Sequence, residues 1–234
     1  MTCVRLHVLV EGQTEEGFVN RILGPELAGS GVFADAHRIT TGRRRGEIQR
    51  GGFVQYDHLA RDLSLWMKQD QGPESWFTTM VDFYRLPTDF PGLARLSRQL
   101  PAADRIKRLE AALADDMTLR LNTLPVCNRF IPYIQLHEFE ALLFSAPAAF
   151  VEAFPGDEAL VTGVAAIRSQ FKTPEDIDES PKTAPSKRIL SLARDYQKPV
   201  AGLLIAERIG LATMRSACPH FDEWLTRLSS LAGS

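Results

Sequence analysis

An apolar run that ends abruptly in an acid is the feature that most constrains how this chain can fold. Residues 4–10 read VRLHVLV, and Glu11 and Gly12 follow at once. A short run rich in valine and leucine is typical of a strand buried in the middle of a sheet. Thr14 and Glu15 then begin a helical pattern, so the chain is expected to pass from strand to helix at Glu11.

The order of a strand followed by a helix recurs along the first 140 residues. The patterns predict strands at 4–10, 36–42, 75–84 and 129–136, and helices at 14–23, 53–68 and 103–122. Gly24 and Pro25 are expected to end the first helix. This alternation predicts an α/β fold, a three-layer sandwich with a mostly parallel central sheet and helices on both faces.

The amino-acid composition of the sequence changes after residue 146. Proline and acidic residues become frequent up to about residue 186, which suggests a small helical insertion with loops. Two further helices are expected in the last 34 residues, separated near Cys218 and Pro219. We therefore expect a core at 1–146 and a helical insertion and C-terminal helices at 147–234, all packed as a single compact domain.

Composition narrows the class of protein. Hydrophobic residues make up 44% of the 234 residues and charged residues 24%, which is enough for a packed core. The net charge of −2 gives no global basic field, so contact with nucleic acid would need a local patch. Three widely spaced cysteines with no CxxC pair argue against a disulfide framework or a zinc ribbon. No apolar run approaches the roughly 20 residues of a membrane span, and the acid at residue 11 leaves no room for a signal peptide, so we expect a cytoplasmic protein.

Acidic residues follow three of the four predicted strands. Because the carboxyl ends of parallel strands meet at one edge of a sheet, these side chains are expected to lie close together. Clustered carboxylates repel one another unless a cation is present, and hard oxygen ligands suit Mg²⁺ or Mn²⁺. Such an ion can activate water and neutralise a phosphoryl group. The predicted ligands are Glu11, Asp82, Glu138 and Glu140.

Each of these acids also has a structural interpretation. Glu11 could cap the first helix, although caps are usually Ser, Thr, Asp or Asn. Glu15 and Glu16 lie in a first helical turn, where the helix dipole favours acids. Asp82 lies in an apolar strand, where an unpaired charge is costly, which favours a functional role. His137 could be a ligand, a general base or a core histidine with its hydrogen bonds satisfied, and the last is the preferred interpretation.

Two basic segments are candidates for phosphate contact. The glycine-flanked stretch GRRRGEIQRGG follows a predicted strand, and arginines there would make binding of nucleic acid depend on salt. A solvated surface loop is the alternative. In TAPSKRI, a lysine and an arginine stand at a predicted helix start, where backbone amides can hold an anion and the lysine could stabilise a transition state. The predicted nucleic-acid-binding residues are Arg43, Arg44, Arg45, Arg50 and Arg188, with Lys187 as a catalytic candidate.

Several motifs together resemble known families. LVEGQTEE followed by an acid-ended strand resembles the Toprim fold of topoisomerases, DnaG-type primases and OLD-family nucleases. More specifically, VEGQTEEGFV, GGFVQYDHLARDL, MVDFYRLPTDFPG, QLHEFEALLFS, TAPSKRI and CPHFDEWL look like DUF4276, an uncharacterised, Toprim-like bacterial family. The resemblance extends from Val10 to Leu225.

The resemblance implies roles for some of these residues. The glutamate that matches Glu11 acts in Toprim enzymes as a general acid/base or a metal ligand, and an Asp-x-Asp pair on a later strand holds Mg²⁺. Here that pair reads Asp82-Phe83-Tyr84, so the second aspartate is missing. Glu138 or Glu140 could supply the missing oxygen, or the site could hold one ion or be inactive. The catalytic candidates are Glu11, Glu15, Asp82, Glu138 and Lys187.

The function predicted from these observations is Mg²⁺-dependent hydrolysis of phosphodiester bonds in DNA or RNA. By analogy with relatives encoded beside AAA or ABC-type ATPases, an anti-phage defence effector with an ATPase partner is expected. The alternative is a non-catalytic Toprim-like module that binds an ATPase or a nucleotide, which Tyr84 favours. Hydrolysis of a nucleotide or another phosphate ester is a third, weaker alternative. No membrane contact is expected, and the sequence leaves the oligomeric state open.

Overall fold

A computed structural model describes residues 3–44, 47–50, 55–97, 99–122, 125–177 and 183–233, with the side chains of residues 41–50 left undescribed. The chain divides into two compact units. The first consists of Met1–Ile134 together with Leu228–Ser234, and the second of Gln135–Arg227.

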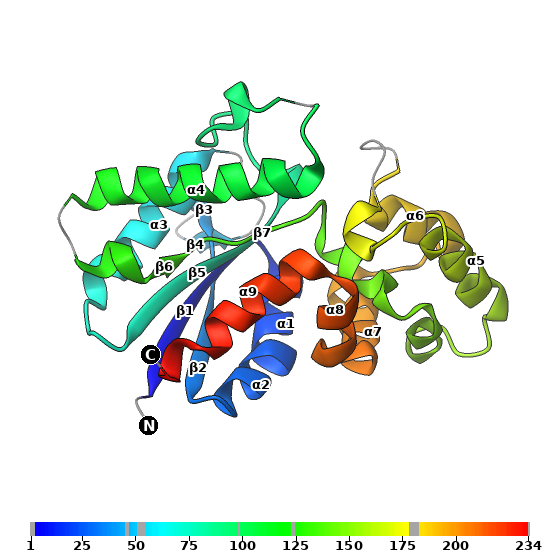
Figure 1. Ribbon diagram of the computed structural model, residues 1–234. Helices are drawn as coiled ribbons and strands as arrows, with labels where there is room; N and C mark the ends of the chain where they lie inside the picture. The colour runs from blue at the N-terminus through cyan, green and yellow to red at the C-terminus, as the bar shows by residue number, and fades with distance from the viewer. Residues whose placement is uncertain are drawn as a thin grey trace. The chain divides into compact units, whose positions relative to one another are not determined.

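A mostly parallel sheet forms the centre of the first unit (Figure 1). Its strands are β1 (Val4–Val10), β2 (Val32–Arg38), β5 (Ser75–Asp82) and β6 (Phe130–Ile131), in the order β2-β1-β5-β6. β1 is paired in parallel on both sides, and Val8 stands between Ala36 and Thr78. The apolar side chains of β1, including Leu6, Val8 and Val10, are fully buried. The prediction of a strand at 4–10 in an α/β sandwich is therefore confirmed.

Helices cover both faces of this sheet (Figure 1). α1 (Gln13–Phe18), a π-helical turn (Val19–Leu23) and α2 (Gly24–Ala28) lie on one face, and α3 (Tyr56–Gln69) and α4 (Ala102–Leu121) lie on the other. The expectation that Gly24 and Pro25 end the first helix was wrong. The wider hydrogen bonding of the π turn accommodates Pro25, which has no N–H to donate. A Cβ at Gly24 would lie only 3.0 Å from the Val19 carbonyl oxygen, so this tight turn requires glycine.

Two other strand predictions needed correction. The strand predicted at 36–42 begins earlier, as β2, and it is followed by an antiparallel pair, β3 (Thr40–Arg44) and β4 (Glu47–Arg50). The basic stretch GRRRGEIQRGG, for which a loop was considered, therefore lies mostly in these two paired strands. The strand predicted at 129–136 is interrupted by Pro132, which leaves only β6 and the short β7 (Ile134–Gln135). Between them, the Thr79 hydroxyl replaces ladder bonds, because it donates to the Tyr133 carbonyl and accepts from the Tyr133 N–H, both at 2.9 Å.

The second unit is helical, as predicted for the C-terminal part. Two 3₁₀ segments (Phe139–Ser145 and Pro147–Glu152) precede α5 (Glu158–Arg168), α6 (Pro185–Leu192) and a π turn (Lys198–Gly202). Three helices follow instead of the two expected: α7 (Leu203–Ile209), α8 (Leu211–Ala217) and α9 (Pro219–Ser229). Gly210 causes the extra break, because its φ of 72° turns the chain out of the helix. Within the described residues, none of the helices has the length and apolar character needed to cross a membrane.

Glu175 holds the start of α9 in the second unit. Its buried carboxylate accepts hydrogen bonds from the backbone N–H groups of His220 at 3.0 Å and Phe221 at 2.9 Å. These amides are at the helix N-terminus, where no intrahelical acceptor exists for them. Burial raises the pKa of the Glu175 carboxyl, and the two amides oppose that shift. Glu175 is therefore a structural acid that the sequence analysis did not single out.

We expect Glu175→Ala to destabilise the protein by about 1–3 kcal/mol, because two buried amides lose their acceptor. The free energy of unfolding would be measured by urea denaturation at pH 7. Glu158→Ala, an exposed first-turn acid of α5, is the matched control and should change stability by less than about 0.5 kcal/mol. Equal effects of the two substitutions would contradict the capping role.

Candidate functional site

Two predicted site residues lie at the carboxyl ends of adjacent parallel strands. The last residue pair in the ladder between β1 and β5 is Val10 with Met80, and Glu11 and Asp82 follow within two residues. Both side chains are buried, with 8% of Glu11 and 3% of Asp82 exposed. This edge is where open parallel sheets bind their ligands. The structure thus places Glu11 and Asp82 at one edge, as their positions in the sequence predict.

Glu15 brings a third carboxylate to the turn between β1 and α1. It lies in the first turn of α1 and is only 3% exposed. A Cβ at Gly12 would lie 3.1 Å from Oε2 of Glu15, so this carboxylate folds back over Gly12. The β1–β5 ladder ends at Val10 and Met80, two residues before Gly12 and Asp82. Glu15 therefore lies beside the turn that Glu11 begins, at the edge of the sheet where Asp82 ends β5.

Cationic and aromatic side chains adjoin these acids. Asp82 is followed by a short 3₁₀ turn (Phe83–Arg85), which contains Tyr84 at the place of the missing second aspartate. Nε of Arg85 lies 3.9 Å from Oε1 of Glu11, and 67% of the Arg85 side chain is exposed, so the ion pair is weak. The Arg105 guanidinium of α4 lies 5.3 Å from the Phe83 ring centroid. Arg85 is not among the predicted site residues, although its place three residues after a strand-end acid was a usable signal.

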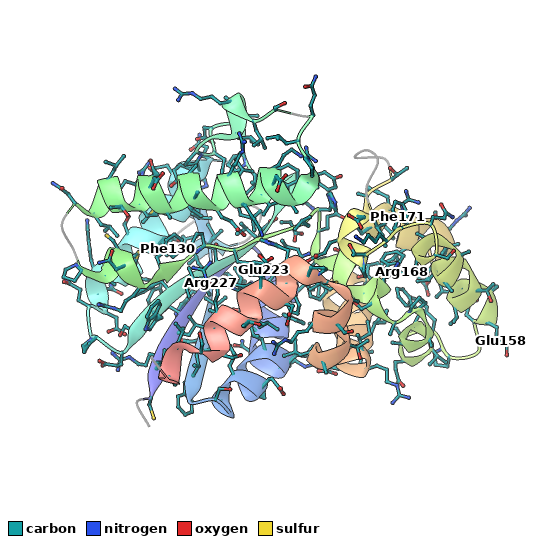
Figure 2. The ribbon with its side chains drawn as sticks, viewed as in Figure 1. Phe130, Glu158, Arg168, Phe171, Glu223 and Arg227 are labelled. Atoms are coloured by element: carbon teal, nitrogen blue, oxygen red, sulfur yellow. The ribbon has the colours of Figure 1, made fainter. Side chains whose placement is uncertain are left out.

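The second unit positions Glu138 and the TAPSKRI residues around the start of α6. Oε2 of Glu138 accepts a hydrogen bond from the backbone N–H of Ser186 at 3.0 Å, which is the interaction of a helix cap. Lys187 is exposed in the first turn of this helix. Arg188 donates to the Thr183 carbonyl at 2.7 Å, and its guanidinium lies 5.1 Å from the ring centroid of Phe171, which is labelled in Figure 2. Arg188 thus makes interactions within its own unit.

Glu140 and His137 also lie in the second unit. Nζ of Lys198 lies 3.2 Å from the carboxylate of Glu140, which is only 2% exposed. Burial raises the pKa of Glu140, Lys198 opposes the shift, and the nearby charge of Glu138 adds to it. Nε2 of His137 donates to the Glu175 carbonyl at 3.0 Å. His137 is thus a buried histidine whose Nε2 is hydrogen-bonded to the backbone, which agrees with the preferred interpretation for that nitrogen.

The remaining candidates are placed as follows. Glu16 forms an ion pair with Arg38 at 3.1 Å. Asp89 accepts hydrogen bonds from the N–H of Tyr56 at 3.0 and 3.2 Å, which caps α3. The backbones of Arg43, Arg44 and Arg50 belong to β3 and β4, but the side chains of all three lie outside the described part of the structure, as does Arg45 entirely.

A group of three side chains that could hold a metal ion occurs elsewhere in the first unit. In the described part of the chain, the residues whose ligand atoms all lie within 4.8 Å of one another are His7, Asp35 and His37. Glu11, Glu15 and Asp82 do not form such a compact trio. Mg²⁺ does not require one, because it is usually held by one or two carboxylates, several waters and the phosphates of a substrate.

The fold and this edge define an α/β protein whose parallel sheet presents buried carboxylates where its central strands end. The chain belongs to the family described as "Domain of unknown function (DUF4276)", which matches residues 10–229 and confirms the resemblance. Among solved structures, the C-terminal region of the OLD protein of Xanthomonas campestris pv. campestris is similar over 97% of this chain and 98% of that chain, with 15% identity and a TM-score of 0.35. A comparison with curated proteins gave no match.

We expect Glu140→Gln to change stability in a pH-dependent way. The folded-state pKa of Glu140 is raised, so its contribution to stability is fully present below the unfolded pKa of about 4.5 and decreases as pH rises toward the folded pKa. The variant should therefore gain stability relative to the parent protein as pH rises above about 4.5. Urea denaturation in metal-free buffer at several pH values between 4 and 8 measures this difference. Glu158→Gln, at an exposed position, is the control for the loss of an acid, and a difference for Glu140→Gln that does not rise with pH would contradict the shift.

Proposed function

We propose that this protein hydrolyses phosphodiester bonds of DNA or RNA with the help of Mg²⁺ or Mn²⁺. The observation that carries the proposal is the placement of Glu11 and Asp82, two buried carboxylates at the ends of adjacent parallel strands, with Glu15 folded over the glycine between strand and helix. Burying like charges together is costly unless a cation balances them.

Glu11 and Asp82 are the residues that would hold the ion. When bound, the ion would supply a Lewis acid for the phosphoryl oxygens and lower the pKa of a bound water. Glu15 would accept the proton of the attacking water, because its carboxylate lies beside the same turn. Arg85 is mostly exposed and would contact the negative phosphate. Because Tyr84 stands in place of a second aspartate, the site has one carboxylate fewer, which favours the binding of one ion instead of two.

The proposal does not require the acids of the second unit. Glu138 already accepts a hydrogen bond from Ser186, and Glu140 is paired with Lys198. An ATPase partner and a role in anti-phage defence are part of the proposal through the Toprim-like family resemblance. The alternative is a non-catalytic module that binds an ATPase or a nucleotide, and Tyr84 is the observation that favours it.

We expect purified protein to cleave DNA or tRNA in Mg²⁺ or Mn²⁺, alone or with an ATPase encoded beside its gene, and to lose cleavage in EDTA. Asp82→Asn and Glu11→Gln should each lower the rate at least about 100-fold, because a metal ligand or general base is lost. The readout is cleavage of labelled substrates on gels. Asp115→Asn, an exposed acid on α4, is the matched control and should cleave like the parent protein.

Cleavage that survives in both Asp82→Asn and Glu11→Gln would exclude this site. If the parent protein neither cleaves nor binds Mg²⁺ or Mn²⁺ by calorimetry with nucleic acid present, the non-catalytic module is favoured.

Arg85→Ala should weaken binding of nucleic acid without regard to sequence, because the lost contact is to phosphate. The slope of log affinity against log salt concentration should decrease in magnitude by about one, because about one fewer counterion is released on binding. Binding would be measured by fluorescence anisotropy at several salt concentrations. Arg95→Ala, on the loop that follows, is the control for the loss of one positive charge, and an unchanged slope in Arg85→Ala would contradict the phosphate contact.

A further inference from the structure

His7, Asp35 and His37 form a cluster on β2 and its neighbour β1 in the first unit's sheet. β2 is the outer strand in the order β2-β1-β5-β6, and the ladder sets His7 opposite Asp35 and Leu9 opposite His37. Residues two apart in a strand share a face, so all three side chains lie on one face. α3 covers this face, because the Trp66 ring stacks on His37 with the ring centroids 3.7 Å apart.

The distances within the cluster match the spacing of ligands around a small metal ion. Nδ1 of His7 lies 3.1 Å from Nε2 of His37, and Oδ2 of Asp35 lies 3.4 Å from the same nitrogen. All three ligand atoms lie within 4.8 Å of one another. Ligands at about 2.0–2.1 Å from a tetrahedral zinc ion stand about 3.3 Å apart. Only a small adjustment of Asp35 is needed to complete one face of a tetrahedron.

A second carboxylate orients His7 for this role. Oδ2 of Asp70 lies 3.0 Å from Nε2 of His7, and Asp70 is itself fixed by Arg5 at 2.8 and 3.0 Å and by the Ser75 hydroxyl at 2.6 Å. A carboxylate held by arginine only accepts, so Nε2 of His7 carries the proton. Nδ1 of His7 then presents its lone pair to the cluster. Histidine ligands of metals are typically oriented by a carboxylate in this way.

We propose that His7, Asp35 and His37 bind a zinc ion, with the fourth position open to solvent. The Asp35 side chain is 72% exposed, whereas those of His7 and His37 are 14% and 13% exposed, so the ion would be held from inside the protein and reached from outside. A hollow of about 230 Å³, lined in part by His37, Trp66 and Asp62, adjoins the cluster. Binding replaces the hydrogen bond between the two imidazoles, and the proton on Nε2 of His37 moves to Nδ1 of the same ring, so that His37 binds as a neutral imidazole.

This site goes beyond the proposed phosphodiesterase, and its ligands select a different ion. Imidazole nitrogens suit zinc and similar transition metals, whereas Mg²⁺ prefers carboxylate, carbonyl and water oxygens. The two sites therefore differ in the cation they take up.

Full-length protein freed of metal with EDTA would be titrated with Co²⁺, a spectroscopic probe for zinc sites, and then with Zn²⁺. We expect the visible absorption of four-coordinate Co²⁺ to reach its maximum at one ion per chain. Zn²⁺ should displace the Co²⁺, whereas excess Mg²⁺ should not displace it. His37→Gln should abolish this spectrum, and Asp35→Asn should weaken the binding of Co²⁺ at least about tenfold. His58→Gln, on α3, is the matched control and should bind as the parent protein does.

Asp35→Asn keeps the test decisive if His37→Gln does not fold, because an exposed side chain can change without disturbing the core. Asp70 is a positioning residue, so Asp70→Asn should weaken the binding of Co²⁺ about 10–100-fold. The variant should retain the fold, which circular dichroism would check. The proposal is overturned if the parent protein gives only the spectrum of hydrated Co²⁺, or if Asp35→Asn binds Co²⁺ as tightly as the parent protein.

The two proposals can fail separately. Glu11→Gln and Asp82→Asn should still bind Co²⁺ and Zn²⁺ like the parent protein, because neither residue belongs to the cluster. Absence of nucleic-acid cleavage with intact Co²⁺ binding would refute only the phosphodiesterase. Cleavage without Co²⁺ binding would refute only the zinc site.

Discussion

Parallel pairing of β1 on both of its sides is the interaction on which the rest of the structure depends. The ladder to β5 brings Glu11 and Asp82 to one edge, and the ladder to β2 brings His7 beside Asp35 and His37. Leu6, Val8 and Val10 are buried completely, and each contributes about 1.5–3 kcal/mol of hydrophobic stabilisation. This apolar burial offsets the cost of placing acids and imidazoles on the same strand.

The two proposed sites thus place two kinds of ligand on one strand. Its carboxyl end presents hard oxygen donors, whereas its middle presents an imidazole at an outer strand pair. The difference follows from position in the strand. Side chains beyond the last ladder pair meet groups from loops and helix starts, while side chains within the ladder meet only their cross-strand neighbours and the covering helix. The type of ligand, more than affinity alone, would then determine which site takes Mg²⁺ or Mn²⁺ and which takes Zn²⁺.

Local patterns in the sequence predicted the elements that depend on local forces. The predicted bounds of β1 are confirmed, and β5 and α4 lie within two residues of their predicted bounds. Two of the errors concern prolines. A π turn accommodates Pro25, which does not end its helix, and Pro132 interrupts a strand whose ladder bonds are replaced by the hydroxyl of Thr79, 54 residues from Tyr133. Glu11 and Asp82 could be found because strand ends are visible in sequence. His7 and His37 could not, because only the register of β1 and β2 unites residues thirty positions apart.

Burial alone does not identify a ligand, because a buried acid can be occupied by structural partners. Glu175 accepts hydrogen bonds from two backbone amides, Glu138 accepts one, and Glu140 pairs with Lys198 at 3.2 Å, so each has a strong partner within the second unit. A close, dry partner competes with any ligand for the carboxylate lone pairs. The proposed site therefore depends on where Glu11 and Asp82 lie, at the ends of adjacent parallel strands, and not on their burial.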